Sequence, residues 1–270
     1  MTNRKQASGY AAGAMLLWLC VYLVAVFCLP KWADILLVLA AALPAFAVCK
    51  ATPIFGSRDC NTIRYPKRAY ALTAGFMISG CALLSFAASL LSRLLGGGTA
   101  TASGGRGDFL YLLVFSCLLP AFFEELLLRG RVLGLVARER GFGIWLCAAL
   151  FALMHIQLQK LPYAFFAGLI LTLLVYLTEC VYLGMLLHFA NNFAALLLSR
   201  LPDTAAYVAA ALLAALFVFC FVRLKKTRLY ADAVGLLCEV RPDTFFAGLH
   251  GAVWLFAVLT LSLGALYLIL

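Results

Sequence analysis

The stretch FFEELLLRG, residues 122–130, places two carboxylates and a guanidinium in the middle of an apolar run. The run extends over residues 109–135, and a helix needs about 17 to 25 apolar residues to cross the hydrocarbon layer of a membrane. A charge at the bilayer centre costs about 2.5 to 3.5 kcal/mol on insertion scales, so carboxylates are rare there unless they are paired or functional. Glu124, Glu125 and Arg129 therefore mark both a membrane fold and a candidate site.

The composition of the whole chain agrees with this interpretation. The 270 residues are 66% hydrophobic and 12% charged, with a mean hydropathy of +1.04, which exceeds what a soluble domain needs to fill its core. We predict an all-α, polytopic bundle of eight to nine transmembrane spans in one integral domain over residues 1–270. The predicted spans are 10–29, 33–49, 69–95, 109–135, 142–159, 162–178, 181–199, 205–224 and 247–270. At LTEC, residues 177–180, two short spans and one broken helix are both compatible with the sequence.

The distribution of basic residues predicts the orientation. With the amino terminus inside, fifteen of the 21 Lys and Arg residues lie in inner segments, five lie in outer segments, and Arg129 lies within a span. The positive-inside rule then predicts a cytoplasmic amino terminus and an external carboxyl terminus, and we expect a bacterial plasma membrane.

The net charge of +10 bears on the expected binding partners, and the ten cysteines bear on disulfides and metal sites. The charge lies in short loops beside the spans, where it serves topology and attracts anionic lipid headgroups, so we expect membrane lipid and no nucleic acid as partners. Most cysteines lie in apolar spans at irregular spacing without a CxxC pair, which predicts neither a disulfide nor a zinc knuckle. The sequence makes no prediction of the oligomeric state.

The charged residues of the opening stretch divide by helical spacing. Glu125 and Arg129 are four residues apart, so they share a helix face and are expected to form a buried, structural ion pair. Glu124 points about 100° away from Glu125 on a helix, which leaves it free to face another group.

Other polar residues are predicted at similar depth. His155 lies in FALMHIQ, and His188, Asn191 and Asn192 lie in HFANNF, where His188 and Asn192 share a face. Three spans would bring these groups and Glu124 together in the inner half or near the middle of the membrane. Because water must reach the site, we expect a cavity open to the cytoplasm.

This set of groups is complete for peptide hydrolysis. A carboxylate in a low-dielectric site is well suited to take a proton from water. A neutral imidazole can share that water, protonate a leaving amine or bind zinc. An imidazole and a carboxamide on one face can donate hydrogen bonds to an oxyanion.

Three short motifs carry a resemblance to a known family. Glu124-Glu125-xxx-Arg129, Phe151-xxx-His155 and His188-xxx-Asn192 resemble the signature of the CPBP family. This family comprises CAAX proteases and bacteriocin-processing intramembrane proteases related to the prenyl-protein endopeptidase that removes the -aaX tripeptide. The similarity covers roughly residues 118–192, within a catalytic core of about 109–200.

The resemblance implies a role for each motif residue. Glu124 would be the general base that activates water, with His155 beside it. His188 and Asn192 would complete the site and stabilise the oxyanion, while Glu125 and Arg129 hold the motif helix. Asn191, which also lies near the face of His188, is a supporting residue. The expected substrate is membrane-associated: a lipidated, possibly prenylated, carboxyl-terminal tail, a hydrophobic peptide, a leader or a transmembrane segment, cleaved toward the cytoplasmic side.

Two mechanisms are open for this family, one with a zinc ion and one with a metal-free glutamate. The sequence has no HExxH and two histidines at this depth, so a zinc site would have to combine Glu124 with His155 and His188. This favours the metal-free mechanism, without a cofactor.

Other classes of function remain open. A membrane immunity or scaffold protein with the same fold would act by binding and would keep its cellular phenotype in a Glu124→Gln variant. A proton-coupled transporter would relay protons through Glu124 and Glu125, so its flux would follow pH. An inactive family member is a third alternative, although no motif residue is missing.

Overall fold

A computed structural model describes residues 2–28, 55, 65–94 and 109–269, and every regular element in these ranges is helical. The all-α prediction is therefore confirmed. The predicted span 33–49 lies outside the described residues. The other eight predicted spans each overlap a helical segment.

From residue 109 onward, the helical segments follow one another with short connections. In chain order they are α1 (Thr2–Cys28), α3 (Lys67–Leu94), α4 (Phe109–Leu112), η2 (Leu113–Leu118), α5 (Leu119–Glu125), η3 (Leu126–Val132), α6 (Leu133–Val136), η4 (Ala137–Glu139), α7 (Gly141–Met154), η5 (Leu158–Lys160), α8 (Leu161–Thr178), α9 (Val181–Leu198), α10 (Asp203–Leu224), α11 (Arg228–Cys238), α12 (Pro242–Ala247) and α13 (Gly251–Ile269). Within the described ranges, six helices are long and apolar enough to cross a membrane, and α7 and α13 are shorter apolar helices. The total of eight to nine spans stays a prediction.

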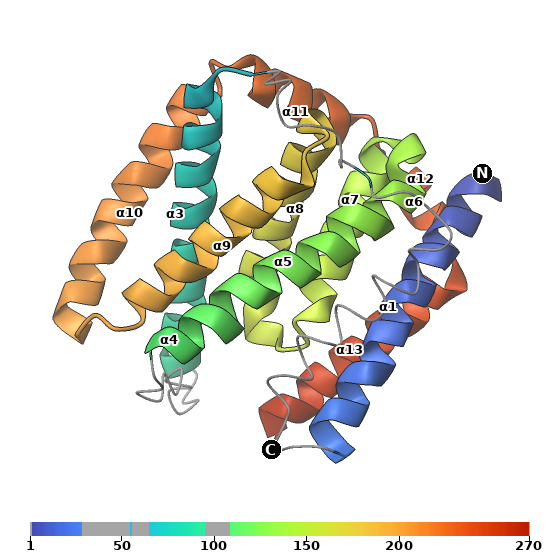
Figure 1. The fold of residues 1–270 in the computed structure, drawn as a ribbon, viewed down its shortest axis with the longest axis horizontal. Coiled ribbons are helices and arrows are strands. Elements are labelled where there is room, and N and C mark those ends of the chain that lie inside the picture. Colours follow the sequence, from blue (N-terminus) through green and yellow to red (C-terminus); the bar gives the residue numbers. More distant parts are fainter. Residues whose placement is uncertain (1, 29–54, 56–64, 95–108, 270) are drawn as a thin grey trace.

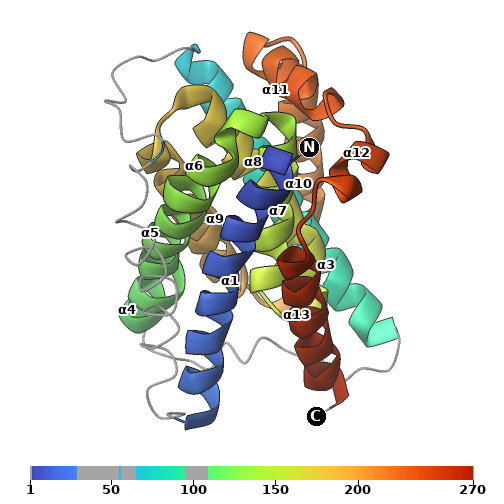
Figure 2. The same ribbon diagram turned by 90° about the vertical axis from the view of Figure 1, so that its right-hand side faces the viewer.

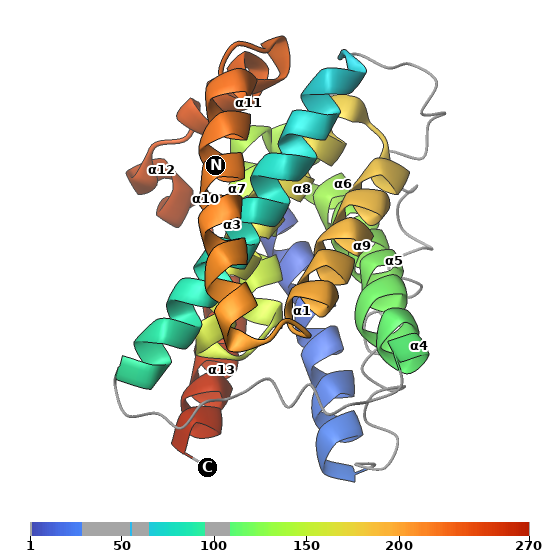
Figure 3. The same ribbon diagram turned by 90° about the vertical axis from the view of Figure 1, so that its left-hand side faces the viewer.

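The bundle has a central group of helices with a helix pair on each side (Figure 1). Helices α5, α7, α8 and α9 form the centre, α1 and α13 pack on one side (Figure 2), and α3 and α10 cross on the other (Figure 3). The amino terminus, α11 and α12 lie at one end of the bundle, together with most described basic residues. We refer to this as the α11 end, and to the opposite end, where α9 passes into α10, as the α9–α10 end. The orientation of these ends in a membrane stays a prediction.

The long helix of residues 109–136 is irregular on both sides of the carboxylates. Two π-helical stretches, η2 and η3, flank α5, which contains Glu124 and Glu125. Pro120 lies at the start of α5, where its missing N–H and its ring disturb a regular α-helix, so the wider turns of η2 accommodate it. Insertions of this kind are frequent at functional sites.

Helix α7 ends earlier than predicted. The span was predicted to continue to residue 159, but the helix stops at Met154, with His155 as its C-cap. Ile156 then adopts a left-handed conformation with φ of 59°, which is strained for a β-branched residue and reverses the chain. His155 is therefore located in a tight turn and not within a helix.

The ambiguous LTEC turn separates two helices. Glu179 adopts a left-handed conformation with φ of 53°, and its N–H bonds the Val175 carbonyl to close α8. Cys180, which follows, is disulfide-bonded, and its partner is not among the described side chains. The prediction of no disulfide is therefore wrong at this position.

The segment 225–246, which lies between the last two predicted spans, contains α11 and most of α12. Thr227 caps α11 by accepting a hydrogen bond from the Tyr230 N–H, and Leu229, Ala233 and Leu236 form its buried face. The indole of Trp145 on α7 donates to the Leu237 carbonyl, which ties α11 to the bundle. The short apolar stripe of α11 did not meet the length expected of a span, so the sequence analysis missed it.

Candidate active site

The predicted ion pair between Glu125 and Arg129 is present and fully buried. Arg129 Nη1 lies 2.6 Å from Glu125 Oε1, and neither side chain is exposed. The remaining guanidinium donors reach α8: Nε donates to Thr172 Oγ1 at 3.3 Å and Nη2 donates to the Gly168 carbonyl at 3.0 Å. The guanidinium also stacks 4.5 Å from the centre of the Phe151 ring on α7. Arg129 therefore connects three central helices.

His188 on α9 lies between the two carboxylates of α5. Its Nδ1 is 2.9 Å from Glu125 Oε1, and its Nε2 is 3.9 Å from Glu124 Oε2. The Glu124 side chain is 20% exposed and that of Glu125 is fully buried. A carboxylate oxygen accepts hydrogen bonds, so the contact with Glu125 puts a proton on Nδ1 and directs Nε2 toward Glu124. Of the two carboxylates, Glu124 is the one that an incoming molecule can reach.

The charges of this cluster nearly cancel. Arg129 neutralises Glu125, which leaves one negative charge on Glu124 when His188 is neutral. One additional proton, placed on Glu124 or on His188 Nε2, makes the whole cluster neutral.

His155 is joined to the cluster through an aromatic ring. Its Nδ1 lies 2.9 Å from the Phe151 carbonyl, an acceptor, so Nδ1 carries the proton in the neutral ring. The Phe151 ring centre is 4.9 Å from that of His155 and 5.5 Å from that of His188. Phe151 therefore contacts both imidazoles and the Arg129 guanidinium, and fixes their relative positions.

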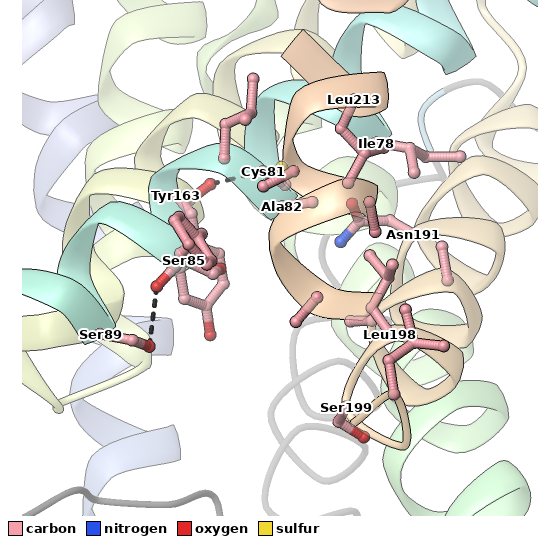
Figure 4. Close-up of a pocket in the computed structure, with 18 of the residues that line it drawn as sticks. Ile78, Cys81, Ala82, Ser85, Ser89, Tyr163, Asn191, Leu198, Ser199 and Leu213 are labelled. Atoms are coloured by element: carbon pink, nitrogen blue, oxygen red, sulfur yellow. Dashed lines mark hydrogen bonds between the residues drawn. The ribbon is translucent and has the colours of Figure 1, made fainter. Parts of the chain in front are cut away.

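Asn192 lies one turn from His188 and borders a cavity of about 490 Å³. Its Nδ2 donates to the Ser116 carbonyl of η2 at 3.4 Å, which leaves its second N–H available. Asn191 also lines the cavity, which lies between α3, α9 and α10 and extends toward the α9–α10 end (Figure 4). This is the end opposite to the one at which the sequence predicted a cavity.

The sequence left open a zinc site made of Glu124, His155 and His188. In the ranges that the structure describes, no three or more His, Cys, Asp or Glu side chains are grouped so that they could hold a metal ion. The Nδ1 atoms of His155 and His188 contact protein acceptors, which leaves Nε2 as the nitrogen of each ring that a metal would contact. Glu124, His155 and His188 are not grouped in this way here, no chemical step is assigned to a metal, and the choice between the two mechanisms stays a prediction.

Three residues near the site escaped the sequence analysis. Thr172 and Gly168 hold Arg129, and the Thr172 hydroxyl also donates to the Gly168 carbonyl at 2.6 Å. Lys160, which lies between the predicted spans 142–159 and 162–178, interacts electrostatically with Glu124 and His155. Threonine, glycine and a loop lysine carry no motif, so the fold was needed to identify them.

Comparison with known proteins gives one family match. Residues 106–194, about a third of the chain, match the family model described as type II CAAX prenyl endopeptidase Rce1-like. No curated protein and no solved structure matches the chain. The matched segment contains all the motif residues, and the six long apolar helices make the chain an integral membrane protein. Residues 106–194 are therefore similar to the family of CAAX-type intramembrane proteases.

Proposed function

We propose that the protein is an intramembrane endopeptidase in which Glu124 activates water to hydrolyse a peptide bond. The observation that carries this proposal is the position of His188, with Nδ1 bonded to buried Glu125 and Nε2 facing accessible Glu124. The 3.9 Å between Nε2 and Glu124 Oε2 is too long for a direct hydrogen bond, and one water molecule can contact both atoms.

The reaction follows from this placement. Glu124 takes a proton from the water molecule, and the water oxygen attacks the scissile carbonyl carbon. This step forms a C–O bond and an oxyanion. When the intermediate collapses, the C–N bond breaks and the leaving nitrogen takes the proton from Glu124. Atoms and charge balance over the two steps, and Glu124 returns to its carboxylate form.

The other residues stabilise charge and orientation. When His188 carries a second proton, its Nε2–H can donate to the oxyanion, and the free N–H of Asn192 is a second donor. Glu125, held by Arg129, stabilises the protonated His188 and fixes its ring. His155 presents Nε2, the nitrogen not bonded to Phe151, as a further proton acceptor.

The substrate is proposed to be a membrane-associated peptide or protein, with a prenylated carboxyl-terminal tail as the first class to test. Purified protein in nanodiscs would be incubated with matched farnesylated and unmodified peptides, and products identified by mass spectrometry. Glu124→Gln and His188→Ala should each lower kcat by about 100- to 10,000-fold, the range of general acid–base catalysis. Glu139→Gln is the matched control, because the Glu139 side chain is also 20% exposed but pairs with Arg4 away from the site.

The outcomes separate the alternatives. Cleavage by wild type and Glu139→Gln, but not by the two site variants, supports the proposal. Loss of cleavage in 1,10-phenanthroline that zinc restores would contradict the metal-free mechanism. If no peptide is cleaved and a cellular phenotype survives Glu124→Gln, a binding or scaffold function replaces the proposed endopeptidase function. Proton-dependent flux in liposomes that Glu124→Gln abolishes would indicate transport.

A further inference from the structure

The cavity beside Asn191 and Asn192 has a mixed, uncharged wall. No Asp, Glu, Lys, Arg or His is among the described residues that line it. Aliphatic and aromatic side chains alternate with hydroxyls and amides, the amides being Gln159, Asn191 and Asn192. A charged ligand group would lose its hydration here without gaining a counter-ion. The wall therefore selects an uncharged ligand.

The cavity borders the candidate active site at two points, although Glu124, His155 and His188 are not among the residues that line it. Asn192 lines the cavity and is one turn from His188 on α9. Tyr163 also lines the cavity, and its ring centre is 6.2 Å from that of His155. A ligand in this cavity would therefore lie beside the groups proposed to cleave the peptide bond.

Asn191 is the wall residue with unused hydrogen-bonding capacity. Its side chain is half-buried and faces the cavity (Figure 4), and it makes no side-chain hydrogen bond within the described part of the chain. By contrast, the hydroxyls of Ser89 and Ser199 donate to carbonyls of their own helices, at 2.9 and 2.8 Å. A carboxamide has both donors and an acceptor, which is the complement of a peptide group.

We propose that this cavity binds an uncharged, extended segment of the substrate polypeptide next to the scissile bond, and that Asn191 pairs with its main chain. The inference rests on the proposed endopeptidase function. A hydrocarbon chain fits the wall less well, because it would cover the Asn191 carboxamide without satisfying its hydrogen bonds. An extended peptide satisfies this carboxamide and also places small or apolar side chains against the aliphatic part of the wall.

Binding would be measured first, in a form that does not depend on cleavage. Glu124→Gln protein in nanodiscs would be titrated with a fluorescent, amidated hexapeptide of alternating Val and Ser, and with the same peptide carrying one Asp. Fluorescence anisotropy should show binding of the uncharged peptide, with affinity at least about tenfold lower for the Asp peptide because its charge is desolvated without a partner.

Two wall variants and a matched control locate the bound peptide. Ala82 faces the cavity on α3, so Ala82→Phe fills it, whereas Ala87 on the same helix is exposed and does not line it. Ala82→Phe and Asn191→Leu should each weaken binding at least about tenfold, and Ala87→Phe should leave it unchanged. Competition by farnesol but not by unlabelled peptide would overturn the proposal in favour of a lipid ligand.

The kinetic arm separates this inference from the proposed function. These kinetics would be measured with Glu124 intact and with a peptide that the protein cleaves. Ala82→Phe and Asn191→Leu should then each raise KM and leave kcat nearly unchanged, whereas loss of Glu124 lowers kcat. If neither wall variant changes KM, the cavity proposal is overturned and the proposed endopeptidase function stands. If Ala82→Phe blocks peptide binding but the protein cleaves no peptide, the cavity proposal stands and the proposed endopeptidase function is overturned.

Discussion

Arg129 shares its three guanidinium nitrogens among a carboxylate, a hydroxyl and a carbonyl, all from residues enclosed by the central helices. A buried cation is tolerated only when it is paired and hydrogen-bonded, and here the cation–π contact with Phe151 adds to the pairing. In return, Arg129 fixes Glu125, and Glu125 fixes His188. The ion pair is therefore best understood as the support of an imidazole.

Removal of the ion pair should separate stability from activity. Glu125→Leu leaves Arg129 buried without its counter-ion, so it should destabilise the protein by about 3 to 5 kcal/mol and abolish cleavage. The double variant Glu125→Leu, Arg129→Met removes both charges, and its thermal midpoint in detergent should recover toward wild type. Cleavage should stay lost because His188 has no carboxylate at Nδ1. A double variant with wild-type cleavage would show that Glu125 does not act through His188.

The Thr172 hydroxyl offers a milder test of the same support. Thr172→Val keeps the shape but removes the acceptor of Arg129 Nε, and should cost about 0.5 to 1.5 kcal/mol and lower kcat several-fold. Thr178→Val is the matched control, because its hydroxyl also bonds a carbonyl of α8, that of Leu174, without contacting the cluster. Equal losses of cleavage in the two variants would contradict a specific role for Thr172.

At the scale of elements, the turn after α7 determines where His155 lies. Ile156 is in a left-handed conformation, and its carbonyl points at Gly264 of α13, where an added Cβ would lie 2.2 Å from the oxygen. No side chain larger than hydrogen fits at that contact without moving the backbone. Helix α13, which lies outside the family-matched segment, therefore constrains a candidate catalytic histidine.

Gly264→Ala should displace this turn and lower kcat by about tenfold or more, since misplacement of a catalytic group by about 1 Å can cost 100-fold. Gly251→Ala is the control in the same helix, because an added Cβ there meets no atom within 4 Å. Steady-state cleavage kinetics would compare the two variants. Unchanged kcat in Gly264→Ala, with an unchanged thermal midpoint, would show that α13 does not position His155.

The sequence predicted the elements better than their ends. Long apolar runs identify the helices, and the four-residue spacing of Glu125 and Arg129 correctly predicted their pairing. The end of α7 was missed because apolar residues continue past it, and nothing in the residue type of Ile156 predicts a left-handed backbone. The support from Thr172 depends on how α8 packs against the π-helical stretch η3, which is a tertiary property without a local signal.

At the scale of the whole molecule, the positions of the two ends relative to the membrane decide from which side a peptide enters. The positive-inside rule assigns the α11 end to the cytoplasm, and the cavity extends toward the other end. Access from the α9–α10 end would then be access from outside, which differs from the predicted cytoplasmic entry.

Short epitope tags on either side of α10 would test this orientation. A tag after Arg200 should be stained in intact cells by an antibody that cannot cross the membrane. A tag after Lys226 should be stained only after permeabilisation. The reverse pattern would invert the bundle and place the cavity on the cytoplasmic side. Each tagged protein should retain its expression level, which controls for misfolding.

The shortness of α7 has a consequence for the path of a substrate. Its 14 residues span about 21 Å, whereas the hydrocarbon layer is about 30 Å thick. In the turn that follows, the N–H groups of His155, Ile156 and Gln157 bond carbonyls and Ile156 is buried, so this non-helical backbone lies within protein and not against lipid. A helical substrate cleaved beside His155 would therefore have to leave the lipid and unwind inside the bundle.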